Sequence, residues 1–437
     1  MANLTNIAPE LILEILSHLK FDRATLSQFA LVCVKFRPLA QQVLLKYLNL
    51  VLDAPIGGGA SPFDHLISML DREPKLRVFP RNLFITWSAR GNNVAPQLSA
   101  LLERLPGLEV LHISTPRKMG RRSIAAELVI NAAGLPVHTL TRLAMFRWSG
   151  GNITSTAVNE VMKLPAMQYI SLQFPPLRYG VEVEFSDRFA SLRRLEVGNW
   201  EISGQDDTLA ALLRKTTSLE VLDVYMGEEG VRLALPYQLG LPYNLGPTLE
   251  PIRHTLTYLT IDGPRFDMIN LDLTGFTSLT TIRALSDLFC CYNRTDRLRD
   301  GMHWKLPKSL RVLEVNLHFQ SHTFQELTVF ELVFMSRRGF FLCAPDPGMS
   351  DIRPNPDLEI DWLCQLAVKK PTHFPGLRSV CIGEDVWDDR MRSEKMVAPE
   401  KLLSAFEANK VFLQIHFRIV EPNFVHRFGS MRFGSSR

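Results

Sequence analysis

Residues 219–224 read LEVLDV, and the same pattern returns as LEVLHI at 108–113 and LRVLEV at 310–315. Aliphatic side chains alternate with polar ones in each copy, which indicates a β-strand with one buried face. Proline, glycine, serine or threonine comes just before most copies, so each strand is expected to follow a turn. Related hexapeptides begin at Leu140, Met167, Leu192, Leu256, Leu279 and Leu377, and a shorter copy lies near Leu83.

The spacing of these copies predicts a repeat protein. Successive copies start 23 to 37 residues apart, except for one step of 67 residues, and most steps lie close to the period of leucine-rich repeats. We therefore predict an α/β fold, a leucine-rich-repeat solenoid with a parallel sheet on its concave face and helices and loops on its convex face. The array is expected to span residues 79–420, with a helical insertion at about 323–370. A linker and a first convex helix precede it at 54–78, and a disordered tail follows at 421–437.

The residues between the leucines of each strand are expected to face the concave sheet, because side chains alternate with a period of two. Exposed aromatic residues mixed with arginine are typical of protein-binding hot spots. The concave face is therefore the predicted surface for a partner protein. The residues predicted to bind it are Arg142, Phe146, Trp148, Tyr169, Arg194, Glu196, Asp223, Tyr225, Tyr258 and Asp262.

Ahead of the repeats, residues 1–53 predict a small helical module. Residues 6–19 read NIAPELILEILSHL, with apolar side chains at the spacing of an amphipathic helix. Asp22 is a suitable N-cap for a second helix, and a third follows from Val32. Three helices in so short a segment bury little apolar surface, so we expect the module to be covered either by the repeats or by another protein.

This module resembles the F-box motif of ubiquitin-ligase adaptors over roughly residues 4–48. The family pattern is a proline and an acidic residue, apolar pairs, a short break, and then Val-Cys with an aromatic side chain three residues later. Ala8 stands where the family usually has leucine, and Phe36 where many members have tryptophan. The resemblance implies that the adaptor-binding residues are Pro9, Glu10, Ile12, Ile15, Leu16, Leu19, Val32, Cys33 and Phe36.

An F-box followed by irregular leucine-rich repeats resembles the substrate receptors of Skp-Cullin-F-box ubiquitin ligases, in particular those of the divergent fungal families. The resemblance implies a non-catalytic subunit that docks on a Skp-type adaptor, and through it on a cullin, and that holds an unknown protein substrate. The alternative is a leucine-rich-repeat interaction scaffold outside any ligase, with the module as its N-terminal cap. The two differ in whether Pro9, Ile12, Ile15, Leu16 and Phe36 form an exposed apolar patch or pack onto the first repeats.

Composition and motifs argue against other classes. A formal charge of +4 over the whole chain is too dilute for a dedicated nucleic-acid binder, and no apolar run is long enough to cross a membrane. The N-terminus lacks the pattern of a signal or transit peptide, and six scattered cysteines fit a reducing compartment, the cytoplasm and/or the nucleus. His318 and His322 lack a third ligand nearby, and the glycines at 57–59 lack the lysine of a phosphate-binding loop. We therefore expect no catalytic site, no metal and no cofactor.

Overall fold

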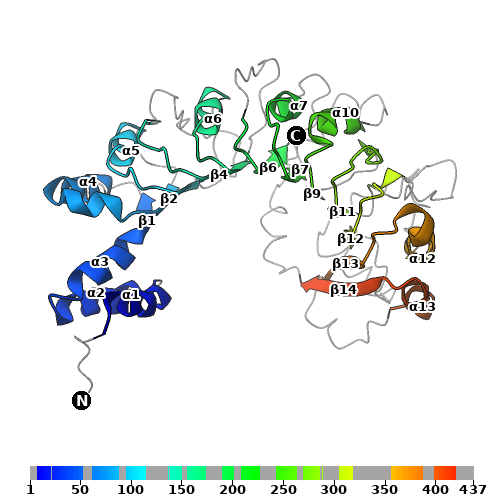
Figure 1. Cartoon of the computed structure of the whole chain (residues 1–437), viewed down its shortest axis with the longest axis horizontal. Helices are drawn as coiled ribbons and strands as arrows, with labels where there is room; N and C mark the ends of the chain where they lie inside the picture. Colours follow the sequence, from blue (N-terminus) through cyan, green and yellow to red (C-terminus); the bar gives the residue numbers. More distant parts are fainter. Residues whose placement is uncertain are drawn as a thin grey trace, which may run out of the picture. The chain divides into compact units, whose positions relative to one another are not determined.

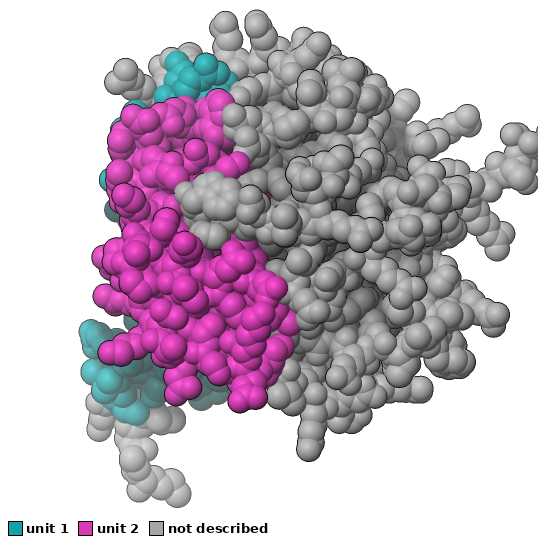
Figure 2. Space-filling view, turned by 90° about the vertical axis from the view of Figure 1, so that its right-hand side faces the viewer, with its two compact units in different colours: residues 1–230 teal, residues 231–437 magenta. Residues whose placement is uncertain are grey.

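The structure, a computed structural model, describes residues 7–20, 22–52, 62–87, 95–114, 136, 138–149, 155–173, 189–200, 208–226, 243–262, 269–285, 288, 305–317, 356–386 and 398–419. The chain forms two compact units, Met1–Gly230 and Val231–Arg437, which Figure 2 colours separately. Both units are built in the same way, from parallel strands that alternate with turns and helices, so the predicted α/β class is confirmed.

The first unit begins with three helices, α1 (Pro9–His18), α2 (Arg23–Val32) and α3 (Arg37–Lys46). Asp22 caps α2, because its carboxylate accepts the backbone N–H of Thr25 at 3.0 Å and the Thr25 hydroxyl at 2.7 Å. These bonds, the backbone one first, hold the pKa of the Asp22 carboxyl below its usual value. The helices enclose a small core of their own, made of Ile12, Leu16, Leu26, Phe36, Ala40 and Val43.

Helix α3 runs directly into the first strand of the sheet, β1 (Tyr47–Leu52). This strand pairs in parallel with β2 (Asn82–Trp87), with Tyr47 opposite Asn82. We predicted a purely helical module up to residue 53, whereas its last residues belong to the sheet. The sequence YLNLVL carries the alternating apolar pattern of a strand, but no turn residue separates it from the preceding helix.

The described residues of the first unit contain seven parallel strands, hydrogen-bonded in chain order. After β1 and β2 they are β3 (Val110–Ser114), β4 (Met145–Ser149), β5 (Tyr169–Gln173), β6 (Arg194–Trp200) and β7 (Val221–Met226). Between them lie α4 (Pro62–Arg72), the 3-10 helix η2 (Pro74–Val78), α5 (Ala95–Leu102), α6 (Ser155–Met162) and α7 (Thr208–Leu213). In Figure 1, helices α4 to α7 all lie on the same side of these strands. Helix α4 is the first helix predicted at 54–78.

The described residues of the second unit contain five more parallel strands in chain order, accompanied by two long helices. The strands are β9 (Tyr258–Asp262), β11 (Thr281–Leu285), β12 (Val312–Leu317), β13 (Ser379–Val386) and β14 (Phe412–Ile419). The long helices are α12 (Pro356–His373) and α13 (Glu400–Ala408). Smaller elements are β8 (Tyr243–Asn244), α10 (Gly246–Leu249), η4 (Glu250–Ile252) and β10 (Ile269–Asn270).

Helix α12 overlaps the C-terminal end of the helical insertion predicted at about 323–370. The rest of that insertion before residue 356, residues 54–61 of the predicted linker and the tail at 421–437 lie outside the described residues.

Every strand buries the aliphatic residues of its repeat motif on one face of the sheet, which we call the core face. Leu111, Ile170, Leu195 and Leu222 lie in one row of the first ladder and are fully buried. Most motifs are preceded, three residues earlier, by one more buried residue, such as Leu105. The predicted motifs fall on strands throughout, with one copy out of register.

Leu140 occupies the position of Leu105, not the position of Leu108 that we gave it. Strand β4 therefore begins three residues later than its motif predicted, and the side chains of that strand fall on other faces than expected.

Candidate interaction surfaces

The face of each sheet opposite the core face carries the alternate, mostly half-exposed side chains of the strands, and we call it the polar face. Seven predicted residues occupy polar-face positions, and in the first unit five of them belong to the adjacent strands β5, β6 and β7. Asp223 is buried, whereas the other six are half-buried or exposed. The seven residues are Tyr169, Arg194, Glu196, Asp223, Tyr225, Tyr258 and Asp262.

Three predicted residues of the repeat that contains β4 do not lie on the polar face. Phe146 and Trp148 are fully buried on the core face of β4, so their predicted role at an exposed surface is wrong. Arg142 is exposed but lies in the turn before β4. The cause is the three-residue slip in register, which turns a whole strand's set of side chains to the other face.

Arg147 lies at the centre of a polar network on the polar face. The sequence prediction missed this residue because of the three-residue slip in register. Its Nη2 donates to the Tyr169 hydroxyl at 2.7 Å and to Glu196 Oε2 at 3.2 Å. The Tyr169 hydroxyl donates to the same carboxylate oxygen of Glu196. Three neighbouring strands are thus joined by one closed set of hydrogen bonds, which fixes the rotamers of all three side chains.

Arg194 extends the network to the next strand. Its Nη2 lies 2.9 Å from Oδ2 of the buried Asp223, and its guanidinium carbon lies 5.1 Å from the centre of the Tyr169 ring. The guanidinium carbon of Arg147 lies 5.8 Å from that centre, so two cations approach one aromatic ring. The surface carries two positive and two negative groups that neutralise each other, and it offers a rigid, pre-organised set of polar and aromatic contacts.

Burial is the largest cause of the pKa shifts of Tyr169 and His112. Burial raises the pKa of Tyr169, and its hydrogen bond to Glu196 raises it further. The pKa of His112, the neighbour of Arg147 in register, is lowered by burial and then by the positive charge of Arg147. His112 Nε2 and Arg147 Nε are buried atoms without a hydrogen-bond partner in the described ranges. A neutral His112 is therefore the favoured form beside Arg147.

The predicted adaptor-binding residues of the helical module separate into two groups. Ile12, Leu16 and Phe36 are buried in the module's own core, and Leu19 and Cys33 are half-buried and pack against it. The remaining residues, Pro9, Glu10, Ile15 and Val32, are exposed.

Further large apolar side chains on the module are exposed that the motif did not include. Leu11 is 55% exposed, as is Ile15 one turn further along α1, and Val34 is 89% exposed after α2. With Leu31 and Val32, the module carries five of the eleven large apolar side chains that are exposed in the described residues. The sequence ELILEIL already contained this signal, because its apolar residues cover more than one face of the helix.

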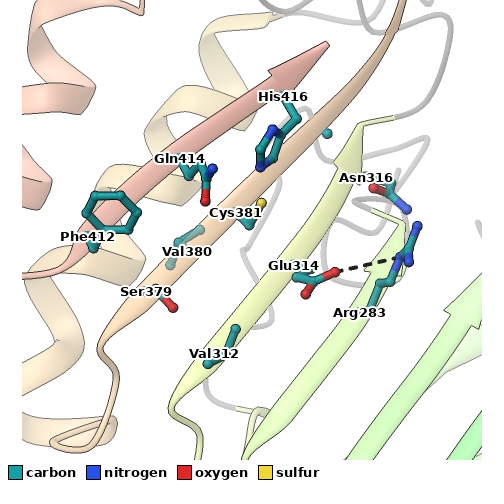
Figure 3. A pocket seen from close by; sticks show the side chains of 11 residues that line it. Arg283, Val312, Glu314, Asn316, Ser379, Val380, Cys381, Phe412, Gln414 and His416 are labelled. Carbon is teal, nitrogen blue, oxygen red and sulfur yellow. Dashed lines mark ion pairs between the residues drawn. The ribbon is translucent and has the colours of Figure 1, made fainter. Parts of the chain in front are cut away.

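In the second unit, the polar face contains an open groove of about 510 Å³ along β13, shown in Figure 3. Its floor is low because β13 carries only small side chains there, and the longer side chains of β12 and β14 form its sides. The residues lining it are Arg283, Val312, Glu314, Asn316, Ser379, Val380, Cys381, Gly383, Phe412, Gln414 and His416.

Within the described ranges, no group of three or more His, Cys, Asp or Glu side chains could hold a metal ion. None of the helices in the described part of the chain combines the length and the apolar character needed to cross a membrane. His318, His322 and the glycines at 57–59 lie outside the described residues.

No protein-family model matches the chain, and no curated protein matches it either.

Proposed function

We propose that this chain is the substrate-recognition subunit of a Skp-Cullin-F-box ubiquitin ligase. The helical module would dock on the Skp-type adaptor, and the polar face of the repeats would hold a target protein. The observation that carries the proposal is the concentration of exposed apolar side chains on a module that already has its own complete core.

The exposed residues of the module favour a partner over a simple cap. The module's core residues pack with one another, which leaves Leu11, Ile15, Leu31, Val32 and Val34 outside that core. Covering a half-exposed leucine or isoleucine contributes roughly 1 kcal/mol each by removing apolar area from water. A partner that covers several of them at once gains several kcal/mol.

The chain would act by positioning and would carry out no chemistry itself. An adaptor and cullin bound to the module, and a substrate bound to the repeats, would raise the effective concentration of a substrate lysine near the ubiquitin-conjugating enzyme. The network around Arg147 and Tyr169 suits such a role, because its side chains lose little further freedom when a partner binds.

The test is binding of the full-length chain to purified Skp-type adaptor. We expect an Ile15→Asp, Val32→Asp double variant to bind at least about tenfold more weakly, since each change places a charge where an apolar contact is required. Both residues are exposed, so the fold is expected to survive, and a thermal unfolding curve checks this.

The matched control is Val368→Asp, Leu403→Asp, which changes two other exposed apolar residues, on α12 and α13. This variant should bind the adaptor like the wild type. Absence of adaptor binding by folded wild-type protein would contradict the ligase role and would leave the interaction scaffold as the function.

A further inference from the structure

The groove along β13 has the dimensions of a site for one extended peptide. Its floor residues Ser379, Cys381 and Gly383 follow each other at alternate positions, so the floor is about 13 Å long at about 3.3 Å per residue. The strands on either side, β12 and β14, lie about 9–10 Å apart, twice the spacing of neighbouring strands. An α-helix with its side chains is about 10–12 Å wide and is too broad to enter between their side chains.

Gly383 keeps the upper end of the floor open. A methyl group on this residue would lie 2.6 Å from Asn316 Oδ1, so any side chain there would displace Asn316 and fill the groove. The position is a regular strand position, paired with Asn316 on one side and His416 on the other. Gly383 therefore forms the upper end of a low floor that Ser379 and Cys381 continue.

The two long sides of the groove differ in chemistry. Phe412, at the lower end, is an exposed aromatic side chain, 65% accessible, on the last strand of the ladder. Two residues further along, Glu314 lines the opposite side. An extended peptide presents side chains to one face at every second residue, so neighbouring side chains on one face would meet Phe412 and Glu314.

Glu314 retains capacity for a ligand cation. Arg283 Nε approaches its carboxylate only to 3.7 Å, which is too long for a hydrogen bond, and this buried Nε has no hydrogen-bond partner in the described ranges. The pKa of the neighbouring Cys381 is raised by burial and next by the negative charge of Glu314, which outweighs the opposing effect of Arg283. The Glu314 carboxylate is therefore available to pair with a positive group of a ligand.

We propose that this groove binds an extended peptide segment that carries an apolar side chain and, two residues away, a lysine or arginine. The apolar side chain packs on Phe412 and the basic one pairs with Glu314. The inference rests on the proposed recognition role and gives it a substrate class, a protein with an extended apolar-basic segment.

The test uses the full-length protein and fluorescently labelled seven-residue peptide pools. One pool has leucine and lysine fixed two residues apart, in either order, and the comparison pool has leucine and glutamate. We expect the lysine pool to bind at least about tenfold more tightly, as for one charge-assisted hydrogen bond. Gly383→Val, whose branched side chain suits a strand, should remove this binding while the protein remains folded.

A charge-matched pair of variants isolates Glu314. Glu314→Gln should abolish the preference for lysine over glutamate, whereas Glu407→Gln, the same exchange on the exposed side of α13, should preserve it. Bound peptide should also slow alkylation of the half-buried Cys381 and leave the buried Cys364 unchanged, as measured by mass spectrometry.

Equal binding of the two pools, binding unaffected by Gly383→Val, or no binding of any pool by folded protein would each overturn the inference. Adaptor binding is measured on the same wild-type and Gly383→Val samples. Absence of peptide binding by wild-type protein that binds the adaptor refutes only the groove, and absence of adaptor binding by folded wild-type protein refutes the ligase role.

Discussion

Trp148 is fully buried on the core face of β4, where it fills space in the same row as Ile113 and Leu172 of the adjacent strands. We predict that Trp148→Ala lowers the free energy of unfolding by about 3–5 kcal/mol, because it removes a large buried side chain and leaves a cavity. Arg142→Ala, in the exposed turn before the strand, should change it by less than about 0.5 kcal/mol. Denaturant unfolding followed by fluorescence measures both, and a Trp148→Ala protein as stable as wild type would contradict its burial.

His112 provides a prediction of pH dependence. Burial and Arg147 lower its pKa below the usual 6.5, so the folded state favours the neutral ring. The stability that this contributes is complete above about pH 6.5 and is lost as the pH falls through the lower folded-state pKa. Between about pH 7.5 and pH 5 the wild type should therefore lose more stability than His112→Gln, as measured by thermal unfolding.

The control for this comparison is His65→Gln, which removes an exposed histidine on α4. It should show the acid response of the wild type. Parallel pH profiles for wild type and His112→Gln would show that His112 does not titrate differently in the folded state.

For single residues, the sequence correctly predicted the face of the sheet that a side chain occupies where the leucines alone set the register of the strand. Tyr169 and Arg194 follow directly from alternation and occupy polar-face positions. Phe146 and Arg147 do not, because their repeat contains two buried leucines three residues apart, Leu140 and Leu143, and either could be the first residue of the motif. The partners of Arg147 lie on other strands, so only the paired register reveals the network.

The end of helix α13 illustrates how one element is held in place. The N–H of Val411 bonds to the carbonyl of Phe406 and the N–H of Lys410 to that of Glu407, both at 3.0 Å, which is a Schellman arrangement. Lys410 has a φ of 50°, a left-handed conformation that favours glycine. The Lys370 side chain of α12 completes the junction by donating to the carbonyls of Asn409 and Lys410 at 2.9 and 2.8 Å.

We predict that Lys410→Gly raises the stability of the second unit by about 0.5–1 kcal/mol, because glycine adopts the left-handed conformation without strain. The same exchange three residues earlier, Glu407→Gly, should lower stability by a similar amount, because that residue is helical. Opposite shifts in melting temperature check the pair. A lower melting temperature for Lys410→Gly would contradict the cap.

Elements bounded by turn residues were predictable, and those without such a boundary were not. The strand at 411–420 and the helix at 357–370 were expected and correspond to β14 and α12. Strand β1 was missed because helical and strand patterns meet at Lys46 without an intervening glycine, proline or turn.

For the whole molecule, we predict that adaptor and peptide bind independently. The module surface belongs to the first unit and the groove to the second, and changes at independent sites usually contribute additively. The change in adaptor binding caused by Ile15→Asp with Val32→Asp should be the same with or without Gly383→Val. Calorimetric titration measures it, and a difference well above about 0.5 kcal/mol would indicate coupling.

The candidate surfaces were only partly predictable at this scale. The motif-based set for the module mixed exposed Ile15 with buried Leu16, because a recognition motif contains both core and contact positions. No sequence pattern indicated the groove, because Gly383 contributes to a groove only together with the side chains of the neighbouring strands β12 and β14.

Because α3 continues directly into β1, the orientation of the module depends on the number of residues at the junction between them. One residue inserted between Lys46 and Tyr47 would turn the module by about 100° about the helix axis and advance it by about 1.5 Å. A partner seated on α1 would then face another direction relative to the sheet, although every contact within the module stayed intact. The number of residues at the helix-to-strand junction therefore sets the direction in which the module surface faces, and it matters there as much as which residues are present.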